Sequence, residues 1–161
     1  RSKAGITFQT VECYPTTYKV ANTNAITWKN SYARTDRMNY FLTGIGDIQN
    51  YIVPVNKLAA SVGGGDTAIE TVSDKLFLLS TIEVFGSASG RREGSQYAYY
   101  SAGNTKLKKV NGSAVMWWHR TPVYDSSIPA FWNLTNISGT GFENRHVTGA
   151  TAFYYAFAFC V

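Results

Sequence analysis

The chain has 161 residues, enough for one domain with a sizeable core and too few for two. Hydrophobic residues make up 45% and charged residues 16%, which is typical of a folded globular protein and excludes a largely disordered chain. The formal net charge is +5, but the basic residues are scattered, with small clusters at residues 91–92 and 106–109. We therefore expect solvated surface charge and no nucleic-acid partner.

The apolar stretches and the first residues bear on where the chain belongs. No stretch approaches the about 18 uninterrupted apolar residues of a membrane helix, so we expect no direct membrane insertion. The start, RSKAGITFQT, has neither an initiator methionine nor the apolar run of a signal peptide. We expect one domain over residues 1–161 that forms the C-terminal part of a longer protein.

Short helices and strands are predicted along the first sixty residues. Residues 6–20 alternate roughly with period two, which predicts a strand or a strand pair broken at Pro15. Residues 28–42 place apolar side chains at the spacing of a short amphipathic helix. Residues 46–60 predict a second short helix and then an extended piece at a sheet edge, because Pro54 removes a ladder donor.

The middle of the chain has two clear local signals. Residues 76–79 form a short apolar run that predicts a buried strand. Ser80 and Glu83 have the spacing of a capping box, which predicts one helical turn that ends at Gly86. The glycines at 63–65 predict a flexible loop, and no Gly-Lys-Ser/Thr follows them as in a phosphate-binding loop.

The last third has the character of strands and loops. Residues 95–103, SQYAYYSAG, predict a short helix or turn with exposed tyrosines. From Ala114 onward the pattern is strand and turn, and the closing TAFYYAFAFCV alternates with period two. The predicted fold class is α+β, with short helices in the first two thirds and a strand- and loop-rich C-terminal third.

Cys13 and Cys160 lie near opposite ends of the sequence. Two cysteines alone cannot form a four-ligand zinc site. One interpretation is a pair of small buried hydrophobic residues. The other is that the first and last strands run side by side, which a disulfide would require because its Cα atoms lie within about 7 Å; whether the two cysteines pair stays open.

Several motifs in order resemble a known group of domains. They are W-K-x-S-Y-x-R from Trp28, then DKLFLLSTIEVFG, EGSQYAYY, WWHRTP and the closing AFAFCV. Together, over roughly residues 26–161, they resemble a domain of formally unknown function found in gut bacteria and their phages. That domain is similar to the C-type lectin fold, in the branch shared with formylglycine-generating enzymes and with variable proteins of diversity-generating retroelements.

The resemblance implies a scaffold whose N- and C-terminal strands lie together and whose C-terminal loops, within about residues 117–155, display a ligand-binding surface. The implied scaffold positions are Trp117, Trp118, Arg120, Pro122, Gly149 and Phe159. The implied ligand-binding and variable positions are His119, Val123, Tyr124, Asp125, Ser126, Ser127, Phe131, Asn133, Asn136, Ser138, Phe142, Asn144, Arg145, His146, Tyr154 and Tyr155. Trp132 joins the expected ligand-binding set as an aromatic anchor.

The composition of this segment agrees with a presented surface. Tyrosine, tryptophan, serine, glycine and asparagine are the residues that antibody loops use, since aromatic rings bring contact area at low entropic cost. The alternative is that aromatic residues at alternate strand positions belong to the core, and we expect about half of the rings to be buried. Arg120 is expected to hold the root of the loops, by cation–π contact or by an ion pair with Asp125 or Glu83.

Catalytic and metal chemistry find little support in the sequence. His119 and His146 have only Asp125 and Glu143 as nearby carboxylates, too few for a calcium site, and we predict no metal and no cofactor. A triad of Ser126, His146 and Asp125 lacks a nucleophile elbow. The resemblance does not carry over the oxidase chemistry of formylglycine-generating enzymes, because their cysteine pair is absent here.

We therefore expect a non-enzymatic receptor-recognition module, the variable protein of a diversity-generating retroelement in a phage or bacterium. Its partner would be a host or target cell-surface protein or glycan, with homo-oligomers formed through the parent protein. Its location would be the virion, at a phage tail tip or fibre, or the bacterial cell surface. The alternatives are a non-diversified structural or adhesion domain of a virion or envelope, and a degenerate relative of formylglycine-generating enzymes.

Overall fold

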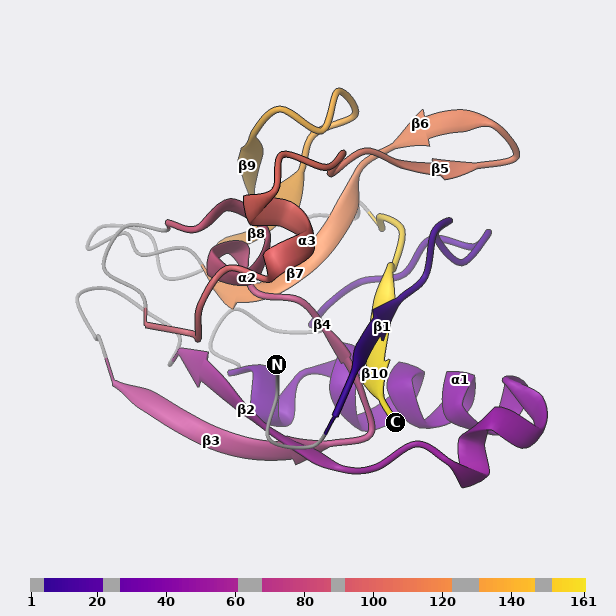
Figure 1. Ribbon diagram of the computed structural model, residues 1–161. Coiled ribbons are helices and arrows are strands. Elements are labelled where there is room, and N and C mark those ends of the chain that lie inside the picture. Colours follow the sequence, from indigo (N-terminus) through magenta and orange to yellow (C-terminus); the bar gives the residue numbers. More distant parts are fainter. Residues whose placement is uncertain (1–4, 22–26, 61–67, 88–91, 123–130, 147–151) are drawn as a thin grey trace.

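The structure is a computed structural model that describes residues 5–21, 27–60, 68–87, 92–122, 131–146 and 152–161 (Figure 1). For residues 131 and 144–146 it describes the backbone alone. Within these ranges the fold is α+β, as the sequence predicted. The predicted glycine loop at 63–65 lies outside the described residues.

The described strands are short and form small antiparallel sheets. Their order is β1-β10-β4, β2-β3, β5-β6 and β7-β8-β9. Their bounds are β1 Thr7–Gln9, β2 Val55–Ala60, β3 Ile69–Asp74, β4 Leu76–Leu78, β5 Lys108–Val110, β6 Ser113–Val115, β7 Trp117–Pro122, β8 Phe131–Thr135, β9 Phe142–His146 and β10 Phe157–Cys160.

The described helices are also short, as expected. Their bounds are η1 Trp28–Asn30, η2 Ala33–Met38, α1 Asn39–Gly44, η3 Gly46–Asn50, α2 Thr81–Phe85 and α3 Ala98–Ser101. The predicted amphipathic helix is real but not uniform, since η1 is 3₁₀-helical and η2 is π-helical. Ala33 and Met38 are both buried five residues apart, a spacing that the wider π turn places on one face.

The first and last strands of the chain lie side by side. β1 and β10 are antiparallel, with Thr7 opposite Cys160, and β10 in turn pairs with β4 (Figure 1). Cys13 and Cys160 are both buried and do not form a disulfide, so the strands adjoin without one. Both interpretations of the cysteines are thus confirmed, apart from the pairing.

The structure confirms the two local sequence signals in the middle of the chain. β4 is buried throughout, and its chain continues into α2, where Ser80 and Glu83 make both hydrogen bonds of the capping box. Gly86 ends α2 with a left-handed φ of 83°. The tyrosines of residues 95–103 are only partly exposed as predicted, since Tyr99 is exposed but Tyr100 is buried against the core.

Candidate functional site

The β7-β8-β9 sheet positions most of the residues that the sequence singled out. At one end Pro122 pairs with Trp132, which pairs with Arg145; we call this the loop-bearing end. The connections at residues 123–130 and 147–151 both begin there, after β7 and after β9. At the other end Thr135 lies opposite Phe142, next to the turn that joins β8 to β9.

All six residues of β7 are buried, although a strand normally alternates. Besides β8, this strand contacts β2, β4, α2 and η1, so elements outside its own sheet cover it. Its register with β8 is also irregular. Trp118 pairs with Leu134 and Pro122 with Trp132, so four steps along β7 match two along β8. The intervening stretch turns toward the rest of the molecule, where the amide of Arg120 donates to the carbonyl of Leu79.

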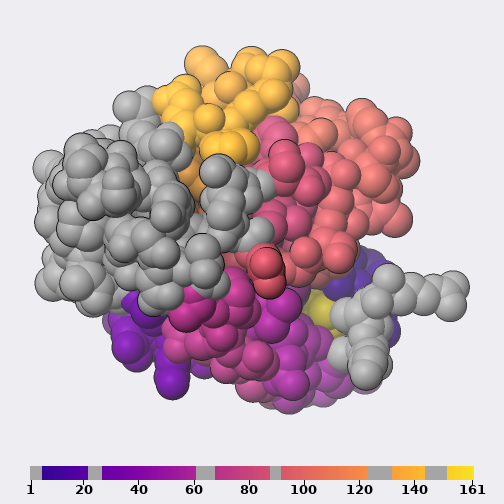
Figure 2. Space-filling model, turned by 90° about the vertical axis from the view of Figure 1, so that its left-hand side faces the viewer, coloured from indigo at the N-terminus to yellow at the C-terminus, as the bar shows by residue number. Residues whose placement is uncertain are grey.

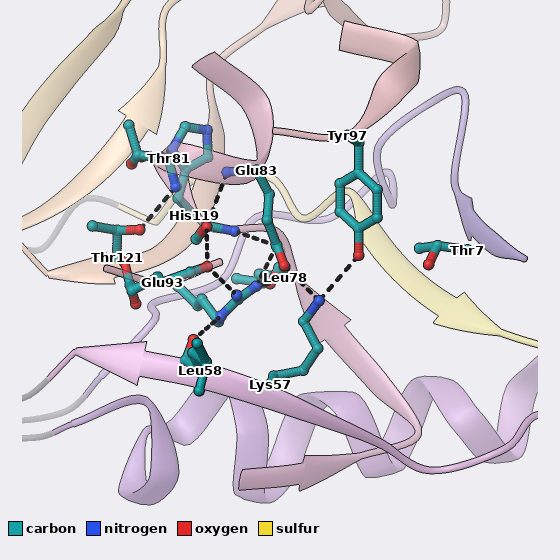
Figure 3. Close-up of polar contacts among 12 residues, drawn as sticks. Thr7, Lys57, Leu58, Leu78, Thr81, Glu83, Glu93, Tyr97, His119 and Thr121 are labelled. Atoms are coloured by element: carbon teal, nitrogen blue, oxygen red, sulfur yellow. Dashed lines mark hydrogen bonds and ion pairs between the residues drawn. The ribbon is translucent and has the colours of Figure 1, made fainter. Parts of the chain in front are cut away.

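Arg120 ties this strand to three other elements, and its partners Leu58, Leu78 and Glu83 are labelled in Figure 3. Its guanidinium donates to Glu83 Oε2 at 2.6 Å and to the Leu78 carbonyl at 2.8 Å. It also donates to the carbonyls of Leu58, at 3.1 Å, and Glu93, at 3.2 Å. The side chain has no exposed surface. Arg120 therefore fixes β2, β4, α2 and the chain at residue 93 against β7. We call this buried part of β7 and the side chains that bond to it the base.

Glu83 carries the negative charge at the centre of this network. Its Oε1 accepts from Lys57 Nζ at 2.5 Å, and its Oε2 accepts from the Ser80 amide at 2.9 Å and from Arg120. Burial alone would raise the pKa of Glu83, but the charges of Arg120 and Lys57 lower it below its usual value. The carboxylate thus stays ionised, flanked by two cations.

Glu93 lies beside the same network but behaves differently. One oxygen of its carboxyl group accepts from the Ala60 amide at 3.0 Å. Burial raises the pKa of Glu93, which favours the protonated acid. Because Ala60 precedes the connection at residues 61–67 and Glu93 follows the one at 88–91, the network joins the roots of several chain connections.

His119 forms a neutral polar cluster next to the charged one. Its Nδ1 lies 2.8 Å from Thr81 Oγ1 and its Nε2 lies 2.6 Å from Thr135 Oγ1, while Asn133 Nδ2 donates to the same Thr81 oxygen. Burial, helped by the nearby charge of Arg120, lowers the pKa of His119 to about 3. The ring is therefore uncharged at neutral pH, with both nitrogens in hydrogen bonds.

The expectation that His119, Trp132, Asn133 and Tyr155 are displayed is wrong. His119, Trp132 and Tyr155 have no exposed surface, and Asn133 is 4% exposed. His119 and Asn133 are drawn inward by Thr81, and the Tyr155 hydroxyl donates to the Lys19 carbonyl. These side chains support the surface from below.

Four other expected positions remain accessible but lie elsewhere. Phe142 is 40% exposed and Ser138 is exposed, while Asn136 and Tyr154 are half-buried. Asn136, Ser138 and Phe142 lie at the turn of the β8–β9 hairpin, at the opposite end from the loop-bearing end. This hairpin forms the top of the face in Figure 2, with β2 and β3 in its lower part. The expected single surface is therefore divided between two ends of one sheet.

The remaining expected positions are the scaffold residues and the residues at or beyond the loop-bearing end. Trp117, Trp118, Arg120 and Pro122 are buried, which agrees with their expected scaffold role, and Phe159 is half-buried. The described backbone places Phe131, Asn144, Arg145 and His146 near the loop-bearing end. The positions outside the described residues are Val123, Tyr124, Asp125, Ser126, Ser127 and Gly149.

Sequence reasoning missed Lys57 and Glu93 and assigned Glu83 mainly to a cap. A signal for Lys57 was present, because the alternation of VNKLAA puts it on the same face as Val55 and Ala59. Glu93 follows a polar loop and carries no such pattern. The ion pair of Arg120 with Glu83 was one of the two predicted, and it is confirmed.

Two further findings hold for the described ranges of the chain. Among these residues, no three His, Cys, Asp or Glu side chains lie close enough together to hold a metal ion. No described helix is both long and apolar enough to cross a membrane.

Fold and site together define an α+β domain that carries two chain connections on one end of a sheet with a buried, charged base. The chain matches the family described as a domain of unknown function, DUF6273, over residues 7–151, and it belongs to that family. No curated protein and no solved structure matches the chain significantly.

Proposed function

We propose that this domain is a non-enzymatic recognition module with a C-type lectin-like scaffold, which binds a cell-surface protein or glycan at the loop-bearing end. One observation carries the proposal. The connections at residues 123–130 and 147–151 begin at the same end of one sheet, and a fully buried arginine holds the base of that end. Binding residues on loops above a fixed scaffold are the usual arrangement of recognition proteins.

The many hydrogen bonds that fix the base support a role in recognition. A binding loop that is anchored before the ligand arrives loses less conformational entropy on binding. Arg120 holds β7 to the carbonyls of Leu58 and Leu78, and Thr121 accepts from the amide of Thr81 at 2.8 Å. The last residues before the connection at 123–130 therefore have fixed positions.

The pairing of β1 with β10 supports the scaffold assignment. The resemblance in the sequence implied that the N- and C-terminal strands lie together, and the described β1 and β10 are adjacent over three residue pairs. The finer assignment to a C-type lectin-like fold, with its variable segment after WWHRTP, remains part of the proposal.

The polar side chains beneath the sheet support a role without catalysis. The side chains of Arg120, Glu83 and Lys57 bond to one another or to backbone groups, and His119 bonds through both ring nitrogens. A general base needs a nitrogen or oxygen within reach of substrate. These buried groups instead stabilise the fold around β7.

Within the expected set, the proposed contact residues are those at or beyond the loop-bearing end. They are Val123, Tyr124, Asp125, Ser126, Ser127, Phe131, Asn144, Arg145 and His146. The proposed setting is a phage tail or a bacterial cell surface, where the domain would belong to a retroelement-diversified protein.

A binding assay on the labelled domain tests the proposal, using an array of bacterial and host glycans and a panel of intact gut bacterial cells. We expect saturable binding to at least one of them. Tyr124→Ala and Asp125→Ala should each weaken that binding by about tenfold or more. Phe142→Ala, at the opposite end of the sheet, is the matched control and should leave binding unchanged.

Two results would contradict the proposal. Binding that survives Tyr124→Ala and Asp125→Ala but is lost with Phe142→Ala would move the contact surface to the β8–β9 turn. The absence of binding to every glycan and cell would favour the fixed structural or adhesion domain. Thermal unfolding of each variant separates lost contacts from lost fold.

A further inference from the structure

A cavity of about 460 Å³ lies between β1 and α3. Its walls come from residues 5–9 and Val11, from Tyr97–Tyr100, from Thr105, Leu107 and Lys108, and from Leu79. It includes no residue of the loop-bearing end. In Figure 3, Tyr97 and Thr7 from its walls appear to the right, away from Glu93 and Thr121. A volume of this size suits a small organic molecule, since ligand pockets measure about 300–1,000 Å³.

The walls of the cavity are mainly apolar. Leu79 and Leu107 contribute aliphatic surface, and Phe8 stacks on Phe159 from the neighbouring strand. At its rim Ile6 is 65% exposed and Val11 is 86% exposed. Exposed apolar side chains that gather at a concave site are typical of a binding surface.

The polar groups of the cavity can donate hydrogen bonds. Tyr97 Oη accepts from Lys57 Nζ at 3.0 Å, and its own proton has no acceptor among the described residues. Lys108 Nζ donates one proton to the Thr10 carbonyl at 2.5 Å, which leaves two. The Tyr100 hydroxyl, in contrast, already donates to Gln9 Oε1.

Lys108 is buried without a carboxylate partner among the described residues. Lys57, the other buried lysine there, has Glu83 at 2.5 Å, whereas Lys108 contacts only a neutral carbonyl. Burial lowers the pKa of Lys108 to about 8, against a smaller opposing effect of Cys13. Buried charges in proteins are normally paired, so this ammonium group has the environment of a site for an anion.

We propose that this cavity binds a small apolar carboxylate, with Lys108 as its counter-ion and Tyr97 as a second donor. The hydrocarbon part would lie against Phe8, Leu79 and Leu107. The proposal concerns residues outside the loop-bearing end and does not depend on the proposed receptor recognition.

The test is isothermal titration of the whole chain with decanoate at neutral pH. We expect a saturable one-to-one heat, and binding of the uncharged methyl decanoate at least about tenfold weaker, because a charge-assisted hydrogen bond is lost. Lys108→Met should weaken decanoate binding by about tenfold or more. Lys109→Met, next in the chain, exposed and outside the cavity, is the matched control and should bind as the wild type does.

A second variant makes the test independent of the stability of Lys108→Met. Ala98 is exposed and lines the cavity, so Ala98→Trp fills it from the surface and should abolish decanoate binding. Three results would overturn the proposal: no saturable heat with decanoate, equal binding of decanoate and its methyl ester, or decanoate binding that Ala98→Trp leaves unchanged.

Discussion

Two consecutive residues of β7 have opposite electrostatic characters. His119 is kept neutral by burial, while Arg120 stays charged because Glu83 lies 2.6 Å away. Taking the guanidinium out of water has a high free-energy cost, which the hydrogen bonds to Glu83 and to three carbonyls offset. The two side chains stabilise the base of the site by different means, and each can be tested separately.

Replacing Arg120 should destabilise the domain severely. Arg120→Met leaves Glu83 with one cation and removes the bonds to three carbonyls, so we expect a loss of about 3–5 kcal/mol in the free energy of unfolding. Arg92→Met, at an exposed position, should change it by no more than about 0.5 kcal/mol. Urea denaturation measures both, and a similar small effect in the two variants would contradict the structural role of Arg120.

His119 should make stability depend on pH. Its pKa is about 3 in the folded chain and near its ordinary value of 6.5 in the unfolded one. As the pH falls, the unfolded chain therefore binds the proton first. His119 contributes its full stabilisation above the pKa that it has in the unfolded chain, and this stabilisation is lost as the pH falls toward the pKa that it has in the folded chain. Relative to His119→Gln, the free energy of unfolding of the wild type should fall by about 2 kcal/mol from pH 7 to pH 5.

The comparison between variants is needed because Glu93 acts in the opposite direction. Its raised pKa lets the folded chain take up a proton as the pH falls, which stabilises it. Denaturation curves of the wild type and of His119→Gln at several pH values measure the effect. An equal dependence in the wild type and His119→Gln would show that His119 is not buried and neutral.

At the scale of elements, α2 connects its own capping box to the hydrogen-bond network around Arg120. Ser80 Oγ accepts from the Glu83 amide at 3.1 Å and donates to the Glu93 carbonyl at 3.0 Å. The Glu83 side chain returns to the Ser80 amide and also reaches Arg120. One short helix therefore connects its own cap to the base of β7.

Ser80→Ala should cost about 1–2 kcal/mol in the free energy of unfolding, since it removes the cap and the bond to Glu93. The matched control is Ser101→Ala, which removes an exposed hydroxyl that bonds to the Ala98 carbonyl and should cost no more than about 0.5 kcal/mol. Thermal or chemical denaturation gives both values. Equal costs would mean that the capping box contributes little.

Elements with local causes could be predicted, and the base of the site could not. The capping box, the buried strand β4 and the alternation of β2 are each set by neighbouring residues. The burial of all of β7 depends on its contacts with β2, β4 and α2, which lie far from it in the sequence. The resemblance in the sequence carries no information on these contacts and therefore misplaced His119, and the aromatic pattern alone could not show that Trp132 and Tyr155 are buried.

At the scale of the whole molecule, β10 closes the fold by lying between β1 and β4. Cys160 of β10 and Cys13 after β1 are buried in the core that this closure completes. Burial raises the pKa of Cys13 to about 12, and Cys160 has no exposed surface. Both thiols should therefore be inert while the domain is folded.

An aromatic disulfide reagent tests this closure. We expect no reaction of the folded chain and full reaction of both thiols once denaturant unfolds it, because thiolate is the reactive form and burial suppresses it. The variant Cys160→Ser assigns the remaining signal to Cys13. Rapid reaction in the folded chain, or no free thiol after unfolding without reductant, would contradict the arrangement of β1 and β10.

The central proposal is that a constant, buried base carries a diversified surface at the loop-bearing end. Deep sequencing of the gene and its downstream DNA in a natural population tests it most directly. We predict a near-copy of the coding region, with variation at its adenine positions that falls on residues 123–131 and 144–151 and spares Arg120 and Trp132. A uniform gene without such a copy, or variation that falls on the buried base, would contradict the account and favour a fixed adhesion or structural domain.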